Sequence, residues 1–413
     1  MSKQSHKLLL GEIILQGVGA LISWNAILTA LDWYNNRFPD SQPGFWIPLL
    51  NFLPSAIFQP LTILYGHKFT FNTRIIIPYI IIAAILVLTP IVVELASDSI
   101  GFILICILTV VMGAVNAIGQ TSVFGLAGVL PEKFTNGVMF GNGLSGLSIT
   151  ILRLICLGIF PQDSDGYLHS TEVYFIISGC TLIVCSLVQV HLMKNPLVIE
   201  NLSKTHSKEA SKAPPLIGEN ELDSFRDSVG EFNHKPKAQV NYKDLFSRIW
   251  QYLFLVWLNY VITFGMLSHV ALATEASEMS YPVFTTLMIF IFNLFDVLGR
   301  YSPAVYLIKR RWLWIFTLSR FVFWLTFILI ASDDPSIPPA WLFSWTWFKF
   351  VNMAIYAYSN GYSSTCSMIH GPSVAPEVCK DKAAYIMVSG LLCGIFSGQI
   401  ISFAFQGIGK VPS

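Results

Sequence analysis

An amide, a carboxylate and a guanidinium lie close together in an otherwise apolar segment, at Asn293, Asp296 and Arg300. At helical spacing these positions are i, i+3 and i+7, so the three side chains share one face. Asp296 and Arg300 are also i, i+4 partners and can pair directly. Charges inside a bilayer cost about 2.5–3.5 kcal/mol each on insertion scales and usually face a protein interior or a watery cavity. The pair is therefore either a structural lock between helices or part of a solute site.

Two other apolar segments carry groups that could bind a planar ring. Trp24 lies in one stripe with Gly17, Leu21 and Leu28, and its indole offers a flat, apolar platform. The alternative is a tryptophan of the interfacial belt. Gln120 is a lone amide among small residues that can both donate and accept hydrogen bonds, or can simply join two helices. Together these groups suit a neutral solute with hydroxyls and a planar heterocycle.

The composition is that of an integral membrane protein. Of the 413 residues, 54% are hydrophobic and only 12% are charged, whereas soluble domains carry about 25% charged residues. The net charge of +1 argues against a nucleic-acid partner. The seven cysteines show no CxxC spacing, and no GxSxG, HExxH or clustered metal ligands occur. We therefore expect no bound metal, no cofactor and no enzymatic activity.

The apolar segments predict an all-α, polytopic membrane protein with eleven transmembrane helices. About 20 apolar residues are needed to cross the hydrocarbon core. The N-terminal apolar run is read as a retained first span, and the fourth and tenth spans are long enough to tilt or break. The expected spans are 8–31, 46–66, 75–95, 101–129, 137–160, 171–193, 247–273, 282–308, 311–331, 341–368 and 383–407.

The loops between these spans predict a topology and a division into two bundles. A cytoplasmic N-terminus places nearly all Lys and Arg residues of the loops in the cytosol, and an odd number of spans then makes the C-terminus extracellular. A plasma-membrane location is favoured, with an intracellular membrane as the alternative. We expect an N-terminal bundle at 1–193, a largely disordered cytoplasmic loop at 194–246 and a C-terminal bundle at 247–413. A monomer is expected.

Four further charged residues fall within the predicted spans. Glu12 and Arg320 are assigned to cytosolic helix ends, where they would snorkel or cap. Arg153 and Lys349 lie deeper and either face a solute pathway or pair with a distant carboxylate.

Glycines at GxxxG spacing predict close helix packing. Gly137 and Gly141 form one such pair, and Gly390, Gly394 and Gly398 repeat the spacing. Small residues let helix backbones approach each other in lipid.

These residues and their order along the chain resemble the equilibrative nucleoside transporter family. Four separated motifs carry the resemblance, in the right order and across nearly the whole chain. Residues 292–300, Phe-Asn-Leu-Phe-Asp-Val-Leu-Gly-Arg, resemble the family's span-eight signature, in which tryptophan usually replaces valine. The other similar segments are 23–25, 120–131, and 359–362 followed by 370–372.

The resemblance implies a fold and a set of site residues. The fold would be a major-facilitator-like arrangement of six plus five helices that carries nucleosides, in some members nucleobases, by alternating access. Trp24 and Leu28 would line the base side, Phe52 would contact the base, and Gln120 would hydrogen-bond it. Asp296 and Arg300 would meet the ribose hydroxyls or control the gate, with Asn293 beside them. Val297 and Ser23 depart from the family pattern and leave the substrate range open.

Facilitated diffusion of nucleosides, with a preference for purine nucleosides, is the favoured function. The alternatives are a proton-coupled nucleoside transporter, in which Asp296, Glu12 or a histidine would exchange protons, and a nucleobase transporter. A membrane enzyme or a ligand-sensing receptor would be a different class of protein, and the missing catalytic motifs argue against the enzyme.

Overall fold

All the regular structure described in this chain is helical. A computed structural model describes residues 3–161, 163–211, 242–267, 271, 281–332, 342 and 345–405. Within these residues no β-strand occurs, which confirms the predicted all-α class.

The first part of the chain forms long helices joined by short turns. Its helices are α1 (Lys3–Thr29), α2 (Leu31–Arg37), α3 (Pro43–Tyr65), α4 (Phe71–Leu95), α5 (Asp98–Val129), α6 (Glu132–Ile159), α7 (Ser164–Leu192) and α8 (Pro196–Ser211). The second part contains α9 (Tyr242–Met266), α10 (Tyr281–Tyr301), α11 (Arg310–Ser319), α12 (Val322–Ser332), α14 (Thr346–Ser373) and α15 (Lys380–Phe403).

Ten segments of the described chain are long and apolar enough to cross a membrane. They correspond to ten of the expected spans. The remaining expected span, 341–368, overlaps α14, whose many polar residues keep it outside that count. Of the expected cytoplasmic loop 194–246, residues 196–211 form α8 and residues 242–246 begin α9, while 212–241 lie outside the described residues.

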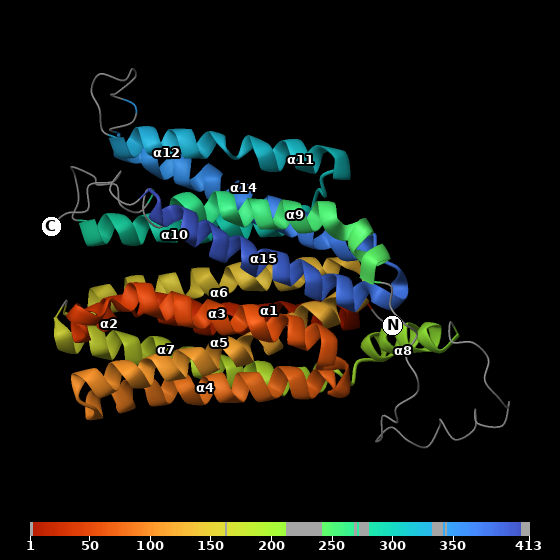
Figure 1. Ribbon diagram of the computed structural model, residues 1–413, viewed down its shortest axis with the longest axis horizontal. Helices are drawn as coiled ribbons and strands as arrows, with labels where there is room; N and C mark the ends of the chain where they lie inside the picture. The colour runs from red at the N-terminus through yellow and green to blue at the C-terminus, as the bar shows by residue number, and fades with distance from the viewer. Residues whose placement is uncertain are drawn as a thin grey trace.

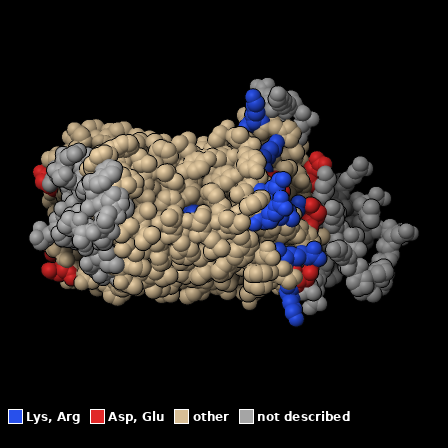
Figure 2. All heavy atoms as spheres, turned by 90° about the horizontal axis from the view of Figure 1, so that it is seen from above, with Lys and Arg blue, Asp and Glu red and all other residues tan. Residues whose placement is uncertain are grey.

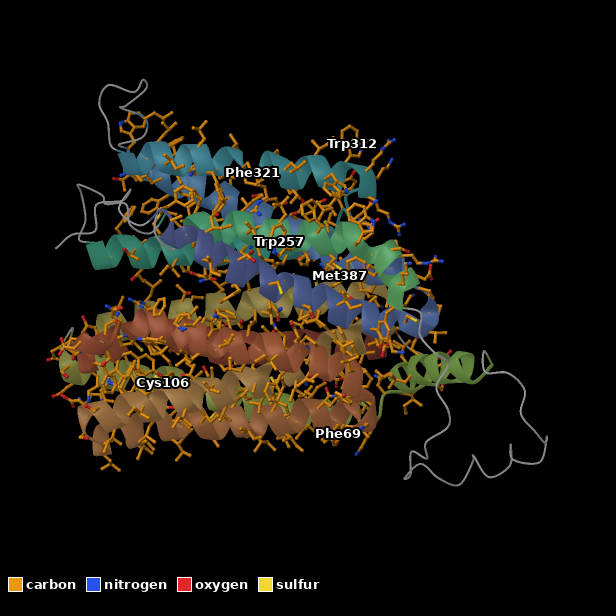
Figure 3. The ribbon with its side chains drawn as sticks, in the orientation of Figure 1. Phe69, Cys106, Trp257, Trp312, Phe321 and Met387 are labelled. Carbon is orange, nitrogen blue, oxygen red and sulfur yellow. The ribbon has the colours of Figure 1, made fainter. Side chains whose placement is uncertain are left out.

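The expected span 311–331 is not one continuous helix. It is divided at Arg320 and Phe321 into α11 and α12, whereas α5 and α14, the long elements in which a break was considered, are continuous. At the junction the backbone tightens to i→i−3 hydrogen bonds, from Arg320 N to Thr317 O (3.3 Å) and from Phe323 N to Arg320 O (3.1 Å). Phe321, labelled in Figure 3, marks this junction.

The helices form two groups that lie against each other (Figure 1). Helices α1 to α7 make up one group, in which α1 packs on α6 and α4 packs on both α5 and α7. Helices α9 to α15 make up the other, in which α9 packs on α15 and α10 packs on α14. The two groups meet mainly where α6 contacts α10 and where α5 contacts α15.

The predicted close packing at glycines is confirmed. A Cβ on Gly141 would lie 2.9 Å from the Cα of Gly17, so α6 and α1 touch through their backbones. A Cβ on Gly394 would lie 2.9 Å from the Cβ of Tyr260 in α9. Small residues thus set the separation of the helices that flank the interior.

Charged side chains are confined mostly to the ends of the helices. Figure 2 shows Lys and Arg side chains gathered at one end of the molecule, and Figure 1 shows that the N-terminus and α8 lie at this end. The broad middle of the surface shown in Figure 2 is almost entirely uncharged, with one small basic spot. We call the Lys- and Arg-rich end the basic end.

Candidate functional site

The predicted pair of Asp296 and Arg300 is formed and buried in α10. Arg300 Nε donates to Asp296 Oδ2 at 2.6 Å, and the side chains of Arg300 and Asp296 are only 8% and 6% exposed, respectively. Helix α10 lies between α6 and α14, so the pair is enclosed where the two helix groups meet. A pair that is both buried and in this position can serve as a lock, as a solute site, or as both.

Glycines on both neighbouring helices make room for the pair. A Cβ on Gly143 of α6 would lie 2.9 Å from Arg300 Cδ, and a Cβ on Gly361 of α14 would lie 2.9 Å from the Arg300 backbone nitrogen. Asn136 of α6 also donates to the Arg300 carbonyl oxygen at 2.9 Å. The position of α10 is therefore determined by direct backbone approach on two sides.

The terminal nitrogens of Arg300 make only long contacts. Nη2 lies 3.4 Å from the Tyr260 hydroxyl, and Nη1 lies 4.0 Å from the Met139 sulfur. A guanidinium has five N–H donors, and most of them are not engaged in short bonds here. Arg300 thus retains donors for an oxygen-bearing solute.

The second oxygen of Asp296 belongs to a hydrogen-bond chain that the sequence analysis missed. Asp296 Oδ1 accepts from Asn360 Nδ2 at 2.8 Å. Asn360 Oδ1 in turn accepts from Asn259 Nδ2 at 2.9 Å and from Thr263 Oγ1 at 2.7 Å. Beyond these two side chains lies Arg320, which is 1% exposed. The site therefore extends from α10 through α14 and α9 to the junction of α11 and α12.

The prediction that Arg320 snorkels or caps at a cytosolic end is wrong. Its guanidinium is fully buried and donates to Asn259, Thr263 and Ser359. Ten residues of helix separate it from Arg310 at the basic end, which is about 15 Å along the axis. That depth is too great for the side chain to reach water.

The other three charged residues within the spans also have partners. Glu12 Oε1 lies 2.5 Å from His191 Nδ1, which joins α1 to α7. Arg153 Nη1 donates to the Thr29 carbonyl oxygen at 3.1 Å. Lys349 is buried in α14, with 8% of its surface exposed.

Asn293 lies beside the charged pair, at a junction of three helices. Its Nδ2 donates to Thr150 Oγ1 of α6 at 2.7 Å. A Cβ on Gly146 would lie 2.6 Å from Asn293 Oδ1 and 3.6 Å from Asn25 Nδ2 of α1. Asn25 donates to Ser145 Oγ at 2.8 Å. Amides from α1 and α10 thus converge on the same turn of α6.

The aromatic part of the predicted site is formed between α1 and α3. The rings of Trp24 and Phe52 make an edge contact with centroids 5.0 Å apart and planes at 66°. Leu28 is half-buried one turn further along α1. Because Asn25 follows Trp24 directly, this aromatic pair adjoins the amide cluster at Gly146.

Eight buried Asn and Gln side chains of the described chain have at least one atom without a hydrogen-bond partner, and three of them lie on α5 and α6. Gln120, a predicted site residue, is 1% exposed and its Nε2 has no partner. Asn116, one turn earlier on the same face of α5, has no partner for Oδ1. Neither Nδ2 nor Oδ1 of Asn142 is bonded, although that residue is 3% exposed. Buried polar atoms normally have partners, so each of these is a candidate contact for a bound solute.

Asn142 is a further site residue that sequence reasoning missed. Its chain neighbours Gly141 and Gly143 pack against α1 and α10, respectively. Since successive helical residues turn by about 100°, the side chain between them faces the seam of α1 and α10. Its position next to close-packed glycines was the signal that could have identified it.

The basic end of the seam between the two helix groups is partly closed. Arg74 Nη1 of α4 donates to the Tyr385 hydroxyl of α15 at 3.1 Å. A half-open cavity of roughly 370 Å³ remains between the α5–α6 and α14–α15 turns. Its lining includes Gly128, Glu132, Thr135, Ile369, Ser373 and Lys380.

No group of three or more His, Cys, Asp or Glu side chains that could hold a metal ion occurs among the described residues. The donor atoms of the site are instead amides, hydroxyls and one carboxylate–guanidinium pair, a set suited to hydrogen-bonding an organic solute.

Comparison with solved structures identifies the fold. The chain aligns over 97% of its length with a major facilitator superfamily transporter, FucP, in the outward conformation, at a TM-score of 0.65 and 11% identity, covering 92% of that chain. It also aligns with the proton:xylose symporter XylE over 97% of its length, at a TM-score of 0.63 and 13% identity, covering 88% of that chain. The protein is thus a multi-pass membrane protein with a major-facilitator-like transporter fold.

Comparison of sequences identifies the family. The family model described as "Nucleoside transporter" matches residues 106–407. The human protein "Equilibrative nucleoside transporter 1" is 25% identical over 95% of each chain. "Nucleoside transporter 1.2" of Leishmania donovani is 24% identical over 95% of this chain and 92% of its own. The chain belongs to the nucleoside transporter family, and the predicted resemblance to its equilibrative members is confirmed.

Proposed function

We propose that this protein moves nucleosides, preferentially purine nucleosides, across the bilayer by facilitated diffusion and leaves them chemically unchanged. The observation that carries the proposal is the buried Asp296–Arg300 pair, whose guanidinium retains unengaged donors at the contact of α6, α10 and α14. Family membership supports the substrate class.

The proposed site divides the nucleoside between two kinds of surface. Arg300 can donate to the ribose hydroxyls, and Asp296 can accept from them. The aromatic rings of Trp24 and Phe52, with Leu28, offer an apolar surface to the base. Gln120 has an amide nitrogen free to donate to a purine ring nitrogen or carbonyl oxygen. Asn293 lies between the two parts.

We further propose that the two helix groups, 1–193 and 247–413, move against each other as bundles in an alternating-access cycle. The contacts between Arg74 and Tyr385, and between Asn136 and Arg300, would break when the basic end opens. The gathering of Lys and Arg at this end supports a cytoplasmic N-terminus and an extracellular C-terminus. We propose a monomer in the plasma membrane.

Uptake by purified protein in liposomes tests the proposal. Labelled adenosine should equilibrate across the membrane, be recovered intact and be competed by inosine. Arg300→Ala should abolish uptake. Arg248→Ala is a matched control, because Asp244 and Arg248 form an exposed pair with the same i, i+4 spacing, and it should transport normally.

The same assay separates the alternatives. Flux that is insensitive to an imposed pH gradient and stops at equal concentrations excludes proton coupling. Competition by hypoxanthine rather than inosine would identify a nucleobase carrier. If no nucleoside moves at all, the proposed function is wrong.

A further inference from the structure

We propose that Arg320 is a positioning residue that determines the transporter's selectivity for ribose hydroxyls, by fixing the direction of the hydrogen bonds that end on Asp296. This inference rests on the proposed nucleoside transport. The chain of side chains involved is Arg320, Asn259 with Thr263, Asn360 and Asp296, and we call it the relay.

The direction of the relay begins at Arg320 because a guanidinium can only donate hydrogen bonds. Arg320 Nη1 donates to Asn259 Oδ1 at 2.5 Å and to the Asn259 carbonyl oxygen at 3.0 Å. Nη2 donates to Thr263 Oγ1 at 2.9 Å. The oxygen of the Asn259 amide must therefore face Arg320, and its NH2 group must face away.

The orientation of the Asn259 amide also determines the orientation of the Asn360 amide. Asn259 Nδ2 and Thr263 Oγ1 both lie within hydrogen-bond distance of Asn360 Oδ1, at 2.9 and 2.7 Å. The single Thr263 hydroxyl proton can also go to the Asn259 carbonyl oxygen, 2.8 Å away, so it does not decide the assignment. The Asn259 NH2 group can only donate, and it therefore requires the Asn360 atom that it faces to be the amide oxygen. The NH2 group of Asn360 is then directed at Asp296 Oδ1, 2.8 Å away. An amide turned the other way would place its oxygen against the carboxylate, which cannot donate when ionised.

The relay leaves Asp296 with donors on both oxygens. Asn360 donates to Oδ1 and Arg300 Nε donates to Oδ2. This arrangement holds the carboxylate plane and turns the remaining nitrogens of Arg300 away from Asp296. Each oxygen keeps lone pairs for a hydroxyl donor.

Burial makes the relay sensitive to any break. Arg320 is 1%, Asn259 0% and Asn360 2% exposed, so water cannot replace a lost partner. No carboxylate lies within salt-bridge distance of Arg320 in the ion pairs found among the described residues. Its positive charge is balanced by the oriented dipoles of the relay, which end on Asp296. In a low-dielectric interior, the hydrogen bonds of such a chain strengthen one another, so the loss of one weakens the others.

The test compares uptake of adenosine with uptake of 2′,3′-dideoxyadenosine, which has the same base without the two hydroxyls. The wild type should have a KM for adenosine at least 10-fold lower than for the dideoxy compound. In Arg320→Gln the KM for adenosine should rise about 10-fold, while that for the dideoxy compound stays within 2-fold. A merely structural role would reduce transport of both compounds alike.

Thr317→Val is the matched control. Thr317 is buried one turn before Arg320, and its hydroxyl bonds Ser363 across the same α11–α14 contact at 2.7 Å. It meets Arg320 only through its backbone carbonyl oxygen, which the substitution leaves in place. This variant should keep the wild-type ratio of the two KM values.

A polarity swap tests the direction of the bonds even if Arg320→Gln does not fold. In Asn360→Asp alone, the new carboxylate faces the carboxylate of Asp296. This variant should therefore lose its selectivity for adenosine over the dideoxy compound. Adding Asp296→Asn restores a donor–acceptor order with unchanged net charge, and should recover part of the selectivity.

Three results would overturn the relay. They are an unchanged ratio of KM values in Arg320→Gln, no recovery in the swap, or a wild type that transports both compounds equally well. A wild type that transports no nucleoside instead refutes the proposed function itself.

Discussion

Removing the carboxylate of Asp296 should damage folding and transport in separable ways. In Asp296→Ala the Arg300 guanidinium loses its charged partner, and the Asn360 amide loses its acceptor, with both groups buried. Stranding a buried charge by deleting its partner costs about 3–5 kcal/mol. An orphaned buried amide adds about 1–3 kcal/mol. We expect a melting temperature lowered on the order of 5 °C or more.

A double variant separates the lock from the site. Asp296→Ala combined with Arg300→Met removes both charges, so no ion is stranded and the melting temperature should recover most of the loss. Transport should stay absent, since the groups proposed to bind the ribose are gone. Asp296→Asn, nearly isosteric, should fold but transport adenosine at least 10-fold more slowly, because its amide can accept from only one of the two donors.

Melting temperature and initial uptake rate should be measured on the same purified preparations. The reasoning fails if Asp296→Ala melts at the wild-type temperature, because the pair would then not be a buried ion pair of this cost. Transport by the double variant, or uptake at the wild-type rate by a well-folded Asp296→Asn protein, would show that transport does not require the charge of Asp296.

Three other substitutions test neighbouring parts of the site. Trp24→Ala should raise the KM for adenosine several-fold with little change in protein abundance, and an unchanged KM would place the indole outside the site. Asn142→Leu should fold as well as the wild type or better, since it removes two unbonded polar atoms, yet weaken nucleoside binding in a competition assay; undiminished binding would exclude a contact. Gly361→Ala should destabilise the protein by about 1–3 kcal/mol in a thermal unfolding assay by pushing α14 off the α10 backbone, whereas Gly11→Ala, with open space around it, should not; equal melting temperatures would refute this close packing.

Local features of the chain were predictable where they depend on spacing within one helix. The i, i+4 relation of Asp296 and Arg300 is a property of helical geometry, and the structure forms that pair. Likewise, the GxxxG pairs mark helix contacts because a missing side chain allows close approach in any bundle.

Features that depend on contacts between distant segments were not predictable in the same way. Arg320 was assigned to a helix end although it lies near the middle of the expected span 311–331, because the sequence shows no local partner that could satisfy a buried guanidinium. Its partners come from α9 and α14, at residues 57 to 61 and 36 to 39 positions away along the chain. Asn142 was overlooked because only the packing of α1 and α10 leaves its amide unbonded.

The sequence by itself determined that the chain is an all-helical membrane protein of the nucleoside transporter family and that one helix carries a carboxylate and a guanidinium that pair. These properties follow from composition, from motifs and from the 3.6-residue period. Only the tertiary structure decided which side chains surround that pair, that α11 and α12 divide at Arg320, and that a directed chain of hydrogen bonds reaches Asp296. Such arrangements depend on which helices pack against each other, and the spacing of residues within one helix does not specify its neighbours.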